Sequence, residues 1–298
     1  MLLTIATTHP PATDLGFLLH KHPDRVQSFD LSVGTAQVFY PEATGSRCTV
    51  ALLLEVDAVG LVRGRKGPGG EGFALGQYVN DRPYAASSMV AVAMARVFRT
   101  AMTGRCDARP ELALAPLPLQ IRIPALPRRG GAELARRVFE PLGWQVEATT
   151  SPLDEHFPAW GESPYVDVLL TGELRLSDAL NQLYVLLPVL DDAKHYWVSS
   201  DEVDKLVRAG GGWLASHPDK ALITARYLAH RGALTRAALA RLAEVDDTEP
   251  DDVDNAGAAP VVAAEPGHPM PLAQQRRGAV LAAVRACGAR RVGDFGCG

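Results

Sequence analysis

The stretch YVDVLLTGELRLSDALNQLYVLLPVLD, residues 165–191, contains the two elements from which we infer the fold. Its first part, residues 165–176, is rich in Val and Leu and predicts a long strand. Its second part, residues 177–191, predicts a helix with Ser177 as the N-cap. A long strand followed directly by an apolar helix is typical of a sheet that is covered by helices.

Earlier parts of the chain repeat this alternation of strands and helices. The expected strands are residues 2–7, 25–31, 35–41, 48–56, 118–126 and 145–151, and the expected helices are residues 14–22, 85–102 and 130–144. Each half of the chain thus has the order strand, helix, two or three strands, helix. Two such units predict an α+β fold with a two-lobed body, mixed or antiparallel sheets, and helices packed on one side.

A change in composition marks the domain boundaries. Residues 199–243 predict three consecutive short helices, a helical trio that completes a body of residues 1–243, with possible lobes 1–115 and 116–243. Residues 244–270 are rich in Asp, Ala, Pro and Gly and contain no aromatic residue. Such a segment cannot bury enough apolar surface to offset its ordering entropy, so we expect an acidic, disordered linker.

The distribution of charge indicates which class of partner the chain binds. The chain has 298 residues and a net charge of −4, but eight of its acidic residues and no Lys or Arg fall between Glu244 and Glu265. The body of residues 1–243 is neutral, which is not the electrostatic pattern of a dedicated nucleic-acid binder and favours a protein partner. No apolar run is long enough to span a membrane, and the four cysteines form no Cys-x-x-Cys pair. We therefore expect a cytoplasmic protein without a zinc site.

The segment of residues 59–88 holds the candidate binding residues. Its glycine-rich first part contains three cations, Arg63, Arg65 and Lys66, which could hold a phosphate or RNA, although a solvated loop is the alternative. Its second part, QYVNDRPYAASS, contains Tyr78, Arg82 and Tyr84, and exposed Tyr and Arg residues favour binding interfaces. The alternative for this second part is a turn in which Asn80 or Asp81 caps the next helix. No group of residues in the chain makes a convincing catalytic set.

The last residues, RVGDFGCG, predict a strand that enters a tight loop. Asp294 follows the strand, while Gly296 and Gly298 allow the backbone to approach a nucleotide-like ligand. A flexible tail is the alternative. We expect residues 271–298 to be the truncated start of a second domain, because an apolar helical stripe precedes the strand.

Several stretches together resemble a known family. They are HKHPDRVQSFDLSVGTAQVFYPEA, LLLEVDAVGLVRGR, QYVNDRPYAASS and the run from DDAKHYW to ALARL. The chain is similar to the amino-terminal half of the bacterial 3′-terminal RNA ribose 2′-O-methyltransferases of the HEN family. Its closing loop, with Asp294, Gly296 and Gly298, resembles the first S-adenosylmethionine-binding loop of that family, although Gly293 and Phe295 replace the usual aliphatic residues.

The resemblance implies a division of labour. The full-length protein would methylate an RNA 3′ end with S-adenosylmethionine and a divalent metal ion, Mg or Mn, whereas the present chain would itself have no enzymatic activity and no cofactor. The amino-terminal half would bind a bacterial polynucleotide kinase-phosphatase/RNA ligase, in a heterotetramer, and promote adenylylation of the ligase. RNA would join the full complex, and neither DNA nor a membrane is an expected partner. The alternative is an RNA-positioning domain that delivers the 3′ end to the methyltransferase domain.

Overall fold

The structure is a computed structural model of the chain. It describes residues 1–32, 34–56, 86–127, 131–191, 200–228 and 232–245. The described residues all belong to one compact unit. None of their helices is both long enough and apolar enough to cross a bilayer.

A seven-stranded sheet forms the centre of the fold. Its spatial order is β2-β3-β4-β1-β5-β7-β6, and each pair of neighbours is antiparallel. The strands are β1 (Leu2–Thr7), β2 (Gln27–Leu31), β3 (Gly34–Ala43), β4 (Cys48–Val56), β5 (Leu117–Pro127), β6 (Gln145–Pro152) and β7 (Glu162–Leu174). The predicted α+β class is confirmed, with antiparallel rather than mixed pairing.

The two halves of the sequence meet within this one sheet. The first strand, β1, lies between β4 of the first half and β5 of the second half, so that Thr4 pairs with Ala51 on one side and Arg122 on the other. The two sequence halves therefore share a sheet, where the sequence pattern predicted sheets in two lobes. The reason is that β1 can pair along both of its edges, which no local pattern specifies.

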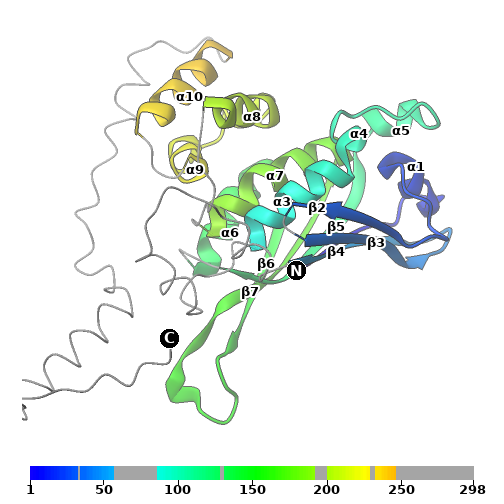
Figure 1. Cartoon of the computed structure of the whole chain (residues 1–298), viewed down its shortest axis with the longest axis horizontal. Helices are drawn as coiled ribbons and strands as arrows, with labels where there is room; N and C mark the ends of the chain where they lie inside the picture. Colours follow the sequence, from blue (N-terminus) through cyan, green and yellow to red (C-terminus); the bar gives the residue numbers. More distant parts are fainter. Residues whose placement is uncertain (33, 57–85, 128–130, 192–199, 229–231, 246–298) are drawn as a thin grey trace, which may run out of the picture. The chain divides into compact units, whose positions relative to one another are not determined.

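Helices cover one face of the sheet. Figure 1 shows α3 (Ala86–Val97) and α7 (Leu176–Asp191) lying side by side across it, with α6 (Gly131–Phe139) near β6. Strand β5 shows how the faces divide, because Leu119, Ile121 and Ile123 are buried in the core while Arg122 is exposed on the other face. This alternation follows from the two-residue period of a strand.

Several local predictions need correction. The predicted helix 85–102 is divided at Phe98, whose backbone leaves the helical region, into α3 and α4 (Arg99–Met102). The helix predicted over residues 14–22 is only α1 (Leu15–Leu19), because His20 adopts a left-handed backbone with φ of 55°. Helix α7 begins at Leu176 and the Ala179 amide donates to the Arg175 carbonyl, so Ser177 lies inside the first turn and is not the N-cap.

Short helices complete the connections. They are η1 (Ala12–Asp14), α5 (Pro110–Leu114), η4 (Glu140–Leu142) and η5 (Pro158–Trp160). The sequence analysis did not predict α5, a single turn with Pro110 at its start.

The predicted helical trio is confirmed. It consists of α8 (Ser200–Gly210), α9 (Lys220–Tyr227) and α10 (Gly232–Val245), and α8 and α9 pack against α7. Fully buried residues in the trio include Leu206, Leu214, Ile223 and Leu228. Helix α10 extends two residues past position 243, and the rest of the predicted linker and residues 271–298 lie outside the described residues.

Candidate functional site

The binding residues predicted from the sequence lie outside the described residues. Segment 57–85 contains Arg63, Arg65, Lys66, Tyr78, Arg82 and Tyr84, and segment 246–298 contains Asp294, Gly296 and Gly298. These assignments remain predictions. The structure describes β4 and α3, the elements that precede and follow the first segment in the sequence.

A buried hydrogen bond holds the start of α3 in place. The Ser87 hydroxyl, at the start of α3, donates to the Asp191 carboxylate at the end of α7, and both side chains are fully buried. Asp191 lies at the negative end of the α7 dipole, where a buried carboxylate needs donors from other elements. The bond therefore joins the start of α3, which directly follows the candidate segment in the sequence, to the end of α7.

Sequence reasoning did not identify Asp191 as the partner of Ser87. An acidic pair that follows an apolar helix, Asp191-Asp192, has the composition of a solvated helix end. The partner Ser87 is 104 residues away in the sequence, so only the packing of α3 against α7 brings the two together.

A pocket lies where the trio meets the rest of the fold. Its volume is about 870 Å³, and η4, the start of α7 and the connection between α8 and α9 form its walls. The side chains that line it include Arg175, Asp178, Gln182, Arg208, Trp213 and His217. Glu173 is also in the lining, so two cations face two carboxylates and the pocket has no strong charge preference.

Buried polar side chains in the wall of this pocket bind to the protein itself. The Trp144 indole Nε1 donates to the Gln182 Oε1 at 2.7 Å, and both residues are buried. A Cβ at position 172 would lie 2.7 Å from the Leu174 Cδ1, 3.0 Å from the Gly143 carbonyl and 3.1 Å from the Trp144 ring, so the indole packs closely against the backbone of Gly172. These contacts give the indole and the amide a structural role.

His217 is held in a similar way. Its Nδ1 accepts the Asp219 amide at 2.9 Å, so its Nε2 carries the proton and donates to the Val138 carbonyl at 3.1 Å. Burial lowers the pKa of His217 below its ordinary value, since the charged ring would lose its hydration, while the Val138 carbonyl and Asp219 oppose this effect. A second contact between the same elements is the ion pair of Arg137 with Asp219. His217 is thus a neutral residue that fixes the trio to α6.

Candidate metal ligands do not cluster in the part of the chain that the structure describes. Within the described ranges, no three side chains among His, Cys, Asp and Glu come together as ligands of a metal ion. The side chains brought together beside the trio are held by hydrogen bonds and an ion pair within the protein.

Comparison with protein families gives a match over residues 1–243. The matching family model is described as "RNA repair, ligase-Pnkp-associating, region of Hen1". The match covers well over half of the chain. The chain belongs to this Hen1 family.

Solved structures similar to this Hen1-family chain come from RNA repair assemblies. One is a chain from "Structure of the Pnkp1/Rnl/Hen1 RNA repair complex", with 14% identity and a TM-score of 0.48, and another is from "Structure of Pnkp1/Rnl/Hen1 complex", with 14% identity and a TM-score of 0.45. In both cases the match covers 81% of this chain and 56% of the solved chain, so the present chain spans little more than half of their length. Among the curated proteins, none is similar enough to match.

The family assignment confirms the resemblance found in the sequence. The Hen1-family match ends at residue 243, and helix α10 ends at Val245. The region that matches therefore contains the sheet, its helical layer and the trio.

Proposed function

We propose that residues 1–243 form a domain that binds and activates a polynucleotide kinase-phosphatase/RNA ligase by promoting adenylylation of the ligase. The observation that carries this proposal is the family match over the same residues, whose description names association with a ligase and Pnkp. A partner that binds only the conformation competent for adenylylation would raise the population of that conformation. The neutral charge of residues 1–243 supports a protein partner over RNA as the main ligand.

The proposal extends to the whole protein. In it, residues 271–298 begin a methyltransferase domain that modifies the 2′-hydroxyl of an RNA 3′ end, using S-adenosylmethionine and a divalent metal ion. Asp294, Gly296 and Gly298 belong to the loop that binds S-adenosylmethionine, and the present chain alone transfers no methyl group. The complex is a cytoplasmic heterotetramer in which RNA is bound by the joint assembly.

An adenylylation assay tests the proposed function. The chain is mixed with its cognate kinase-phosphatase/ligase and radiolabelled ATP, and covalent AMP on the ligase is followed. We expect AMP incorporation to rise with added chain and to saturate, and we expect alanine substitutions of Tyr78, Arg82 and Tyr84 to reduce the effect. A ligase that incorporates the same amount of AMP with and without the chain contradicts the proposal.

A second candidate function is positioning of RNA for the methyltransferase domain. The observation that favours it is the group of three cations Arg63, Arg65 and Lys66 within a glycine-rich segment. It predicts that the chain binds labelled single-stranded RNA with an affinity that falls steeply as salt rises, and that replacing the three cations with alanine weakens binding and flattens the salt dependence. Unchanged affinity in this triple variant rules out that role for the segment.

A further inference from the structure

The β6–β7 hairpin extends beyond the strand beside it. Strand β5 ends at Pro127, which pairs with Tyr165, whereas β7 continues back to Glu162 and pairs there with Pro152 of β6 alone. Figure 1 shows this two-stranded arm projecting away from the sheet and its helices. We call residues 151–164 the arm tip.

Hydrogen bonds within the arm tip order its turn. The Leu153 amide donates to the Gly161 carbonyl at 2.9 Å, the Trp160 amide to the Phe157 carbonyl at 2.9 Å, and the His156 amide to the Asp154 carboxylate at 2.7 Å. Gly161 has a φ of 83° and ψ of −161°, a conformation that is accessible essentially to glycine alone. The arm tip thus has a defined conformation even though almost all of its residues are exposed.

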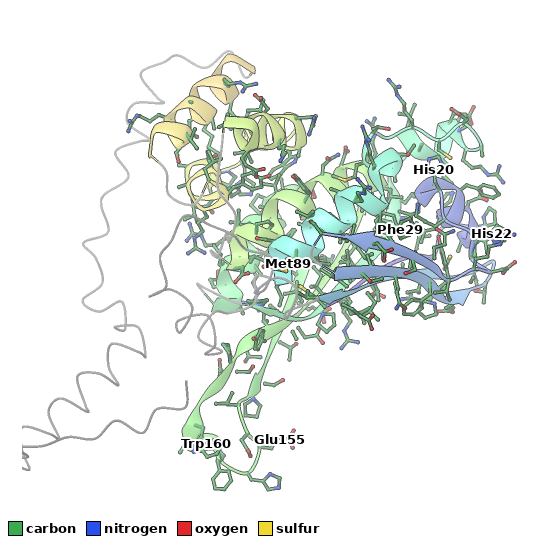
Figure 2. The ribbon with its side chains drawn as sticks, viewed as in Figure 1. His20, His22, Phe29, Met89, Glu155 and Trp160 are labelled. Atoms are coloured by element: carbon green, nitrogen blue, oxygen red, sulfur yellow. The ribbon has the colours of Figure 1, made fainter. Side chains whose placement is uncertain are left out.

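Large apolar side chains are exposed on this ordered turn. The rings of Phe157 and Trp160 stack with their centroids 4.8 Å apart and an interplanar angle of 15°. They are 53% and 60% exposed, and Leu153 beside them is 54% exposed. Figure 2 shows Trp160 and Glu155 at the far end of the arm, away from the core. None of the three apolar side chains packs against the hydrophobic core, so the fold does not explain why they are apolar.

The charge of the arm selects between two classes of partner. The arm tip contains three acidic residues, Asp154, Glu155 and Glu162, and residues 145–174 contain no Lys or Arg. Asp167, further along β7, is paired with Arg122 of β5. Stacked aromatic rings that bind single-stranded nucleic acid are normally accompanied by a positive groove for the phosphates, and this arm has the opposite sign. Exposed Trp and Phe within an acidic surround instead complement an apolar pocket bordered by Lys and Arg on a protein.

We propose that the arm tip is a docking element that inserts the Phe157–Trp160 pair into an apolar, basic-rimmed pocket of the kinase-phosphatase/ligase partner. This inference rests on the proposed function, and it adds the surface that makes the contact. The ordered turn lowers the entropy lost on binding, because the rings are already held in one stacked arrangement. Trp160 is the central anchor, and the acidic residues steer the association.

Binding of the whole chain to its cognate partner, measured by isothermal titration calorimetry, tests the docking element. We expect Trp160→Ala and Phe157→Ala each to weaken the affinity by roughly 30-fold, which is the usual effect of removing a hot-spot side chain. Glu155→Arg should weaken it less, mainly through slower association, and should reduce its salt dependence. The matched control is Phe17→Ala, which removes an exposed ring (49% exposed) from another surface and should leave the affinity unchanged.

The outcomes separate the docking element from the function on which it rests. If the wild-type chain and the arm variants bind and activate the ligase equally well, the docking element is wrong and the proposed function stands. If the wild-type chain does not bind the partner at all, both are wrong. If the arm variants lose affinity for labelled single-stranded RNA while partner binding is unchanged, the arm is an RNA-stacking element and the docking proposal is overturned.

Discussion

The helical trio, which packs against α7, and the β6–β7 arm, which extends from the sheet, differ in the exposure of their apolar residues. The trio buries residues such as Leu206 and Leu214 completely and packs against α7. The arm tip leaves Phe157 and Trp160 more than half exposed on an ordered turn. The trio therefore contributes to the stability of the fold, whereas the apolar residues of the arm tip contribute little to it.

This difference separates structural from functional residues by their effect on stability. A buried apolar side chain stabilises the folded state through removal of its surface from water, and an exposed one gains nothing until a partner covers it. Variants in the trio should therefore lower the free energy of unfolding more than the affinity for the partner. Variants in the arm tip should lower the affinity more than the free energy of unfolding.

The largest expected effect on stability is in the trio. We expect Leu214→Ala to lower the free energy of unfolding by about 2–5 kcal/mol, since Leu214 is fully buried and its removal leaves a cavity. Trp160→Ala should change it by no more than about 0.5 kcal/mol. Urea unfolding followed by circular dichroism measures both variants. A large loss of stability in Trp160→Ala would contradict the difference between the trio and the arm tip, since it would give the arm tip a structural role.

An intermediate effect is expected in the pocket beside the trio. Gln182→Leu removes the acceptor of the Trp144 indole N–H and leaves that donor buried and unsatisfied, so we expect a loss of about 1–3 kcal/mol in the free energy of unfolding. The double variant Trp144→Phe with Gln182→Leu should be less destabilised than the sum of the single variants. Strict additivity in this cycle would show that the hydrogen bond contributes nothing.

The attachment of the trio should depend on pH through His217. Because burial lowers the pKa of His217 in the folded state, the unfolded state takes up the proton first as the pH falls. The contribution of the neutral ring is fully present above about pH 6.5 and is lost as the pH falls through the folded-state pKa. We expect the free energy of unfolding to fall between pH 7 and 5 with a smaller slope in His217→Leu than in the wild type. Equal slopes in the two proteins contradict this role.

The smallest effect is expected on the surface of the trio. Arg241 of α10 pairs with Asp204 of α8, and both side chains are substantially exposed. We expect Arg241→Ala to lower the free energy of unfolding by only about 0.2–1 kcal/mol, and less at high salt, because solvent screens such a pair. Chemical denaturation in 0.05 M and 1 M NaCl provides the check, and a larger loss in high salt would show that the Arg241 stem stabilises the trio by packing.

The strands and the main helices could be predicted because their patterns are local. Residues 2–7 and 48–56 have the bounds predicted for them, and α7 starts one residue before its predicted first residue. Local pattern failed at Phe98 and His20, where backbone geometry ends a helix within a sequence that could continue it. Neither Phe nor His is a residue type that normally marks a helix end, so the sequence pattern carried no signal for these two ends.

The candidate binding residues also divide into those that the sequence predicted and those that it did not. The sequence singled out Tyr78, Arg82 and Tyr84 from residue type alone, and these assignments stay predictions. No binding role was predicted for the arm tip, because an aromatic pair in a connecting loop has the same composition whether it is buried or exposed. The available signal was the absence of Lys and Arg over residues 145–174, which marks an arm of one charge sign.

Periodicity and long matching stretches were enough to predict the α+β class, the helical trio and the family. The pairing of β1 with both halves in one sheet, and the contact of Ser87 with Asp191, became known from the three-dimensional structure alone. It alone also showed that Phe157 and Trp160 are stacked in solvent. The physical reason is that periodicity records whether a residue is apolar, whereas pairing and burial depend on contacts between residues far apart in the chain.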